Sequence, residues 1–313
     1  MSSLLVDSPG LLTTVQDLGR EGFGPLGVSP SGAADPLALQ VGNLLLGNPR
    51  GAAALEMTLL GGRFSFPEGA VIAAAGSDFA ARANGEPLAP YVAHTIPPGG
   101  SASFGPTRSG ARSYLCVAGG IEVPRVLGSS STHLLSGLGG FHDRALRKGD
   151  ALSLGESPQS NPRHTISSAA IEMLQARKTL RATIGPQFDW FAADTRQSLF
   201  TNAFHVIEES NRMGLRLNGP ALPLLNQSEL ISEGVSLGAI QVTPSGQPII
   251  LFVEQQTAGG YPKIANIIAA DLPSVGQLRP RDEIRFELVT VEAARSLYLA
   301  QQHLLNSPEL LFT

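Results

Sequence analysis

The chain of 313 residues has little charge, few lysines and no long hydrophobic run. Charged residues make up 15% of it and the formal net charge is −4, which excludes the strongly basic surface that nucleic acids and anionic membranes bind. Gly, Pro or charge interrupts every apolar stretch before the length of about 18 residues that a transmembrane helix needs. No basic segment followed by an apolar one, as in a signal peptide, is visible at the N-terminus. We expect a cytoplasmic protein with no nucleic-acid or membrane partner.

A single cysteine, Cys116, excludes an intramolecular disulfide and argues against a structural zinc site. It lies in the apolar run YLCVAGG, which favours a buried, inert thiol over a nucleophile. The six histidines form no H-E-x-x-H or H-x-H pattern, so we expect no metal site. No G-x-x-x-x-G-K-[ST] sequence occurs, which excludes a P-loop for nucleotide phosphates. A G-x-G-x-x-G match at 22–27 neither follows an apolar strand nor opens a helix, which argues against dinucleotide binding.

Glycine (35 residues) and proline (23 residues) are abundant, and the apolar runs between them are short. Such runs, bounded by turn residues, predict strands at 71–76, 113–120, 239–246, 248–254 and 283–289. Good helix formers predict helices at 35–47, 167–177 and 291–305. The first of these begins with Asp35 as N-cap and Pro36 in the first turn. Strands dominate, so the predicted fold class is mostly β with a few peripheral helices.

A polar stretch at 156–180 is the best candidate for a linker, and it predicts two domains, 1–158 and 179–313. A faint repeat relates the two halves. Ala-Gly-Gly follows a predicted strand in each half, and a turn ending in Asp precedes a later apolar run in each, at Lys148-Gly149-Asp150 and Pro280-Arg281-Asp282. The similar offsets are what a duplicated β-barrel domain would leave.

The densest polar cluster is TTVQDLGREGFGPLGVSPSGAAD at 13–35, where five glycines separate the side chains of Gln16, Asp17, Arg20 and Ser31. Glycines let a backbone approach a ligand closely, and the planar guanidinium of Arg20 suits a carboxylate or a phosphate. Asp17 could accept a proton or orient Arg20. A loop fixed by an Asp17–Arg20 pair explains the same residues without a function.

Two further clusters lie in the second half. In SNRMGLRLNGP (210–220), Asn211 precedes Arg212, which could bind an anion or satisfy loop carbonyls. In VEQQTAGGYPKI (253–264), Glu254 and Gln256 would point to one face of a strand. There a carboxylate and an amide could position an amide substrate and take up a proton, with Lys263 as a further donor. An ordinary strand end with a Tyr-Pro turn is the alternative.

Ten ordered blocks of this sequence resemble the KipA family, whose members are also known as the C subunit of 5-oxoprolinase, allophanate hydrolase subunit 2 or the biotin-dependent carboxyltransferase family. The blocks extend over about residues 5–290 and include TTVQDLGREGF, GVSPSGAADPLAL, ALEMTLLGG, RSYLCVAGGIEVPRVLGSSST, SNRMGLRL, SEGVSLGAIQVTPSGQPIIL and QTAGGYPKIA. The resemblance implies two cyclophilin-like β-barrel domains, here 1–158 and 179–313, the second with a C-terminal helix.

The resemblance also implies a function in a complex with two partners, a KipI-like B subunit and an A subunit. The implied reaction is ATP-dependent opening of 5-oxo-L-proline to L-glutamate, with the ATP bound elsewhere in the complex because this chain lacks a nucleotide loop. We predict Asp17, Glu254 and Gln256 as catalytic residues. The predicted substrate-binding residues are Gln16, Arg20, Ser31, Asn211, Arg212, Thr257, Tyr261 and Lys263. This prediction requires the stretches near 16, 211 and 256 to line one pocket.

Two positions depart from the family pattern. Glu254 stands where the family usually has Asp, which places the carboxylate one methylene further out. Arg281 stands where the family favours glycine, and it is strained if the turn needs a positive φ there.

Two other functions are open. A biotin-dependent carboxyltransferase subunit, like the related domain of urea carboxylase, would move a carboxyl group to a urea-like acceptor from biotin on a separate carrier. A KipA-like antagonist would bind a KipI-like kinase inhibitor without turnover. 5-Oxoproline and urea both present a planar amide, so the residues alone hardly distinguish a 5-oxoprolinase subunit from a urea-like carboxyltransferase subunit.

Overall fold

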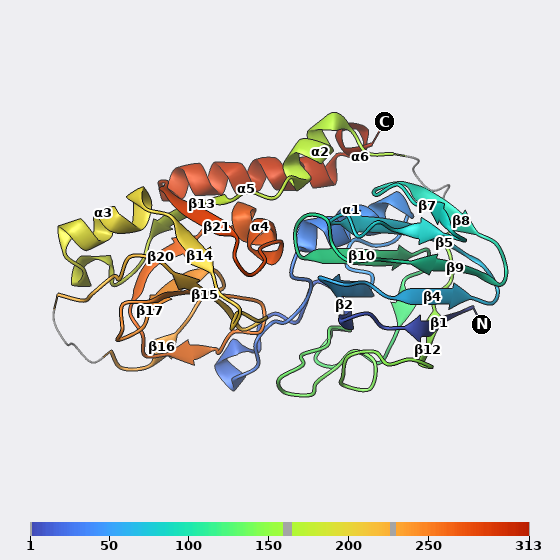
Figure 1. Cartoon of the computed structure of the whole chain (residues 1–313), viewed down its shortest axis with the longest axis horizontal. Helices are drawn as coiled ribbons and strands as arrows, with labels where there is room; N and C mark the ends of the chain where they lie inside the picture. The colour runs from blue at the N-terminus through green and yellow to red at the C-terminus, as the bar shows by residue number, and fades with distance from the viewer. Residues whose placement is uncertain (1, 159–164, 226–229, 313) are drawn as a thin grey trace. The chain divides into compact units, whose positions relative to one another are not determined.

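The computed structural model describes residues 2–158, 165–225 and 230–312, and it divides into two compact units (Figure 1). The first unit comprises Met1–Arg20, Ser31–Gln175 and Leu304–Thr313, and the second comprises Glu21–Pro30 and Ala176–His303. Each unit is therefore built from more than one stretch of sequence. The predicted boundaries at 158 and 179 stay a prediction, and residues 159–164 of the predicted linker lie outside the described residues.

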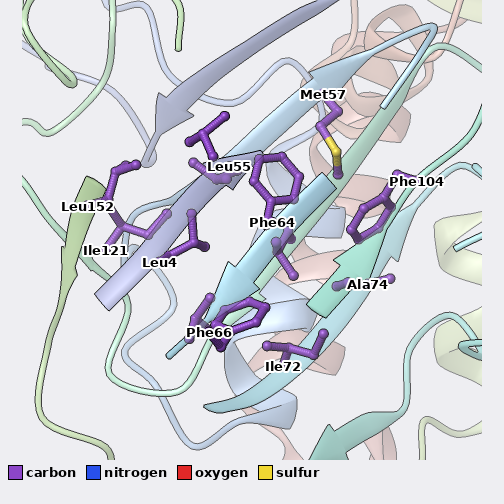
Figure 2. Packing of buried hydrophobic residues seen from close by; sticks show 14 of the residues in the cluster. Leu4, Leu55, Met57, Phe64, Phe66, Ile72, Ala74, Phe104, Ile121 and Leu152 are labelled. Carbon is purple, nitrogen blue, oxygen red and sulfur yellow. The ribbon is translucent and has the colours of Figure 1, made fainter. Parts of the chain in front are cut away.

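Antiparallel strands form two sheets in the first unit. The larger sheet has the order β11 (Ile121–Glu122), β12 (Ala151–Leu154), β1 (Ser3–Ser8), β4 (Arg63–Phe66), β9 (Gly100–Ser103), β6 (Arg82–Ala83) and β7 (Glu86–Pro87). The smaller one has the order β2 (Leu12–Gln16), β3 (Ala54–Thr58), β10 (Arg112–Val117), β5 (Ala70–Gly76) and β8 (Ala93–Ile96). Both sheets contribute to one hydrophobic cluster, in which Leu4 and Phe64 pack with Leu55 and Ile72 (Figure 2).

The smaller sheet is covered on its other face as well. Alternate residues of β5 and β10, including Ala73 and Tyr114, belong to a second cluster with α1 (Pro36–Leu45). Because successive strand residues point to opposite faces, burial of both faces explains the unbroken apolar runs at 71–76 and 113–120. The helices α2 (Ser168–Leu174) and α6 (Pro308–Leu311) complete the first unit.

The second unit is a closed barrel. Its strands follow the order β13 (Thr179–Ile184), β20 (Lys263–Ile267), β17 (Ala239–Val242), β18 (Pro248–Leu251), β15 (Gly214–Asn218), β14 (Phe204–Val206) and β21 (Glu283–Leu288). The barrel closes through a parallel pairing of β13 with β21. A small separate sheet joins β16 (Glu233–Gly234) to β19 (Ala258–Gly259). The helices are α3 (Ala193–Thr201), α4 (Leu272–Gly276) and most of α5 (Val291–Asn306).

The predicted mostly-β fold class is confirmed, and so are the three predicted helices. Asp35 caps α1 as expected, since its Oδ1 accepts a hydrogen bond of 3.0 Å from the Ala38 N–H. The strands predicted at 239–246 and 248–254 are shorter than expected. They end at Val242 and Leu251 because each runs into a hydrogen-bonded turn, such as the one in which Gln255 N–H bonds Phe252 C=O at 2.8 Å. Across residues 2–158, 165–225 and 230–312, no helix is both long and apolar enough to cross a membrane.

The two turns that end in Asp have the same hydrogen bonding in both units. In the first, Gly149 N–H bonds Val6 C=O at 2.8 Å and Asp150 Oδ2 accepts from Arg147 N–H at 2.7 Å. In the second, Arg281 N–H bonds Val206 C=O at 2.7 Å, and the corresponding carboxylate, that of Asp282, accepts from Arg279 N–H at 2.9 Å. The repeat detected in the sequence thus corresponds to the same hydrogen-bonded turn, ending in Asp150 in the first unit and in Asp282 in the second.

Arg281 adopts the left-handed conformation that its counterpart Gly149 adopts at no cost, with φ of 74° against 90°. Replacing Arg281 with glycine is expected to raise the free energy of unfolding by about 1 kcal/mol, since a residue with a Cβ is strained there. Arg281→Ala is the matched control, because it also removes the exposed Arg281–Glu208 ion pair (3.1 Å) but keeps the strain. Chemical denaturation measures both, and a glycine variant no more stable than the alanine variant would refute the strain.

Cys116 has no exposed surface, and burial raises the pKa of its thiol to about 12. Its Sγ lies against Gly42, where a Cβ would approach it to 2.7 Å. At about pH 8 we expect N-ethylmaleimide to leave the folded chain unmodified, because the thiolate is the reactive form and is both rare and inaccessible. Mass spectrometry should show one adduct after unfolding in guanidinium chloride. Rapid modification of the folded chain would contradict the predicted inert thiol.

Candidate functional site

The carboxylate of Asp17 is enclosed by the loop at Ser129–Ser131 in the first unit. Oδ1 accepts hydrogen bonds from Ser129 Oγ (2.6 Å), Ser131 Oγ (2.5 Å) and Gly19 N–H (2.8 Å). Oδ2 accepts a fourth bond from Ser130 N–H (2.6 Å). Four donors match the approximately four lone-pair positions of a carboxylate. In this structure Asp17 therefore fixes the loop, and a role as proton acceptor requires one of these bonds to open.

A loop rich in hydroxyls and backbone N–H groups, such as Ser129–Ser131, is a candidate for binding a phosphate. The hydroxyls of Ser129 and Ser131 and the Ser130 N–H, which would hold a phosphate, all donate to Asp17. A buried anion of the chain itself thus uses the donors that a phosphate needs. This loop does not fit a nucleotide phosphate.

Gln16, Arg20 and Ser31 surround the same loop. Gln16 Nε2 and Ser31 Oγ both donate to the carbonyl of Thr132, at 3.0 and 2.8 Å. Arg20 Nη2 donates to the carbonyl of Ser131 at 2.5 Å, and its side chain is almost fully buried. Gln16 Oε1 is buried without a hydrogen-bond partner in the described part of the chain. The four predicted residues of the first cluster are therefore brought together around one loop.

In the second unit, Arg212 and Glu254 form a buried ion pair. Arg212 Nε donates to Glu254 Oε1 at 2.5 Å, and the Glu254 N–H donates to the Arg212 carbonyl at 2.8 Å. The two side chains are 6% and 3% exposed. The pair joins segments 42 residues apart in the sequence. A buried charge pair held this firmly stabilises the fold only as a pair, since either charge alone would be costly.

Gln256 does not share a face with Glu254. Residues 252–257 form a turn instead of a continuing strand, so the alternation that placed the two side chains together does not apply. Glu254 is buried and Gln256 is exposed. The Gln256 amide lies beside Gly259 together with the amide of Gln241, since a Cβ at Gly259 would approach their Nε2 atoms to 2.6 and 2.7 Å. A side chain at this position would require the two amide ends to move away from the backbone.

Lys263 is buried at the start of β20 and contacts two residues that the sequence patterns did not reveal. Its ammonium pairs with Glu233, and Gln187 Nε2 donates to the same carboxylate oxygen at 2.8 Å. The hydrogen bond from the Lys263 ammonium lowers the pKa of Glu233. The hydrogen bond from Gln187 lowers it further and is the second-largest cause. Neither partner is close to Lys263 in the sequence, and no sequence spacing predicts these contacts.

The serine loop at 129–131, by contrast, is visible in the sequence as a run of hydroxyl side chains, but its contact with Asp17 is not.

Asn211, Thr257 and Tyr261 are the remaining predicted residues, and their hydrogen bonds involve the backbone. Asn211 Oδ1 accepts from Met213 N–H at 2.8 Å, which caps a turn. The carbonyls of Thr257 and Tyr261 accept from Val235 N–H (3.1 Å) and Gln241 Nε2 (3.3 Å). Tyr261 is exposed, whereas Glu254 and Lys263, on either side of it in the sequence, are buried.

The predicted residues of the first unit thus gather around the loop that Asp17 holds, whereas in the second unit Arg212 pairs with Glu254 and Lys263 pairs with Glu233. That the two groups line a single pocket stays a prediction. Among residues 2–158, 165–225 and 230–312, no group of three or more His, Cys, Asp and Glu side chains could hold a metal ion.

Residues 26–288 match the family described as "Carboxyltransferase domain, subdomain A and B". The chain belongs to this family. It is 37% identical to the C subunit of 5-oxoprolinase from Escherichia coli, covering 94% of this chain and 93% of that protein. It is 36% identical to the C subunit of 5-oxoprolinase from Haemophilus influenzae, covering 91% and 90%. The crystal structure of the urea amidolyase of K. lactis superposes with a TM-score of 0.92 at 30% identity, over 99% of this chain and 21% of that one.

Proposed function

We propose that this carboxyltransferase-domain chain is the C subunit of an ATP-dependent 5-oxoprolinase, which opens 5-oxo-L-proline to L-glutamate together with its A and B subunits. The observation that carries the proposal is the end-to-end similarity to two proteins named as the C subunit of 5-oxoprolinase, with nine-tenths of each covered. The buried, firmly hydrogen-bonded polar groups at the predicted residues support it, because a small polar substrate needs fixed partners.

The chemical need is to activate and hold a resonance-stabilised lactam. In the proposed division of labour, Glu254 supplies the carboxylate that takes up a proton, and Arg212 orients it through Nε. Gln256, an exposed residue, hydrogen-bonds the amide of the substrate. Asp17 holds the loop at 129–131 and through it the carbonyls that contact Gln16, Arg20 and Ser31. Asp17 is thus a positioning residue in this proposal, and Glu254 is the base.

ATP is assigned to another member of the complex. The serine loop, which was the candidate for phosphate contacts in this chain, is filled by the Asp17 carboxylate. The chain therefore contributes the lactam site, and its partners contribute the energy of nucleotide hydrolysis.

A second candidate function is a carboxyltransferase subunit that uses biotin on a separate carrier. The family description and the close superposition on a urea amidolyase favour it. The same pair of Glu254 with Arg212 and the amide of Gln256 could then position a urea-like acceptor, since this acceptor also presents a planar amide.

Co-expression with candidate A and B subunits tests the proposal. We expect glutamate release from 5-oxoproline and ATP only when this chain is present, and none from the chain alone. Glu254→Gln, which keeps the shape of the side chain, should abolish release, whereas the exposed control Glu209→Gln should not change it. Carboxylation of urea by carboxybiotin, without glutamate release, would favour the carboxyltransferase instead. Full activity of Glu254→Gln would refute the assigned base.

A further inference from the structure

Two buried donors in the second unit converge on one carboxylate oxygen. The Lys263 ammonium and Gln187 Nε2 both donate to Glu233 Oε1. Lys263 and Gln187 are only 3% and 7% exposed, whereas the Glu233 side chain is 44% exposed. The donors therefore belong to the interior of the unit, and the acceptor reaches them from its surface.

The Gln187 amide is held in place without help from Glu233. Lys263 lies in the barrel strand β20, and its N–H donates to Gln187 Oε1 at 3.0 Å. Gln187 N–H in turn donates to the Lys263 carbonyl at 3.2 Å. This exchange of hydrogen bonds fixes the amide so that its Nε2 faces the ammonium's partner. A buried lysine charge and a buried, preorganised amide N–H form a binding position for one carboxylate.

Glu233 is held much more loosely than the donors are. It belongs to the two-residue strand β16, which pairs with the two-residue strand β19 through Glu233 with Gly259 and Gly234 with Ala258. Its neighbours Ser232 and Gly234 are exposed. A carboxylate in this position can return to water at little cost, whereas a buried ammonium must keep an anion beside it. The arrangement therefore permits exchange of one carboxylate for another.

We propose that Lys263 and Gln187 form a carboxylate-binding subsite, which Glu233 occupies in this structure as an internal stand-in for the carboxylate of a small ligand. The proposal rests on the proposed function for the identity of that ligand, since 5-oxo-L-proline carries one carboxylate beside its lactam. Glu233 then competes with the substrate, and the affinity of the site is set by that competition.

Calorimetric titration of the full chain with L-5-oxoproline and with 2-pyrrolidinone, the same lactam without the carboxylate, tests the subsite. Glu233→Gln should bind 5-oxoproline about three- to tenfold more tightly, because the competing charge is removed while the side-chain size is kept. Its affinity for 2-pyrrolidinone should not change. Lys263→Met should lose the preference for the carboxylate, and Gln187→Leu should weaken it. Glu209→Gln, which removes an exposed carboxylate of the same unit, should behave as the unmodified chain.

Unchanged or weaker binding of 5-oxoproline by a folded Glu233→Gln variant would overturn the subsite, and so would the absence of binding to every variant. If Lys263→Met does not fold, Gln187→Leu carries the same test. The two proposals fail separately. Tighter 5-oxoproline binding by Glu233→Gln in a complex that releases no glutamate would keep the subsite and refute the reaction. Normal glutamate release with a KM unaffected by Glu233→Gln would keep the reaction and refute the subsite.

Discussion

Replacing Arg212 with alanine is expected to lower the free energy of unfolding by about 3–5 kcal/mol, because it leaves a buried carboxylate without its counter-charge. Glu254 is 3% exposed and its Oε1 lies 2.5 Å from Arg212 Nε, so water cannot replace the guanidinium without opening the barrel loop. Urea denaturation of the folded chain measures the loss. Glu254→Gln should cost somewhat less, about 2–4 kcal/mol, because the new amide oxygen still accepts a hydrogen bond from Arg212 but the buried guanidinium loses its counter-charge.

A double variant separates the structural role of this pair from its proposed chemical role. Arg212→Met with Glu254→Leu replaces both charges by apolar side chains, and such replacements often recover the stability that single removals cost. We expect this variant to be folded, with most of the lost stability restored, and to release no glutamate in the reconstituted complex. A folded double variant that retains activity would show that the pair serves the fold alone.

Removing the carboxylate of Asp17 is expected to have a second large effect. Asp17→Ala leaves the Ser130 N–H and two serine hydroxyls without their common acceptor, and should lower the free energy of unfolding by about 3–5 kcal/mol. Asp17→Asn should cost about 1.5–3 kcal/mol, because its amide turns one donor towards the Ser130 N–H or the hydroxyls. Thermal and urea unfolding should rank alanine below asparagine.

The exposed Glu86→Gln, in the same unit, is the matched control and should change stability by less than about 0.5 kcal/mol. Hydrogen exchange should locate the defect, with faster exchange of the amides at 129–132 in the Asp17 variants. Loss of glutamate release by Asp17→Asn at unchanged stability would contradict the positioning role and restore Asp17 as the base.

Local sequence signals predicted the elements whose causes are local. Asp35 and Pro36 placed the start of α1, and the unbroken apolar run around Cys116 predicted a strand, which the structure buries on both faces. The positive φ suspected at Arg281 is present, because the turn is fixed by hydrogen bonds that its counterpart at Gly149 shares. Division of the chain into units was harder to predict. Residues 21–30 belong to the second unit although the segments before and after them belong to the first, and residues 304–313 belong to the first unit although the preceding segment belongs to the second.

The site was predictable in residue types and less so in geometry. Glu254 and Gln256 were expected on one strand face, but the turn that begins at Phe252 separates them. Glu233 and Gln187 escaped notice because their contact with Lys263 depends on tertiary folding across 30 and 76 residues. The hydroxyls of Ser129–Ser131 looked available to a ligand, since a sequence cannot show that a carboxylate more than a hundred residues away already occupies them.

The assignment of residues 304–313 to the first unit has a consequence for biosynthesis. Leu305, Leu311 and Phe312 pack in the same cluster as α1 (Pro36–Leu45), which is translated at least about 260 residues earlier. While the barrel strands are still emerging from the ribosome, that hydrophobic cluster lacks Leu305, Leu311 and Phe312, and part of its apolar surface is exposed to solvent. The N-terminal part therefore cannot complete this cluster until residues 305–312 have been synthesised, and before that stage its exposed apolar face is a surface that a chaperone would bind.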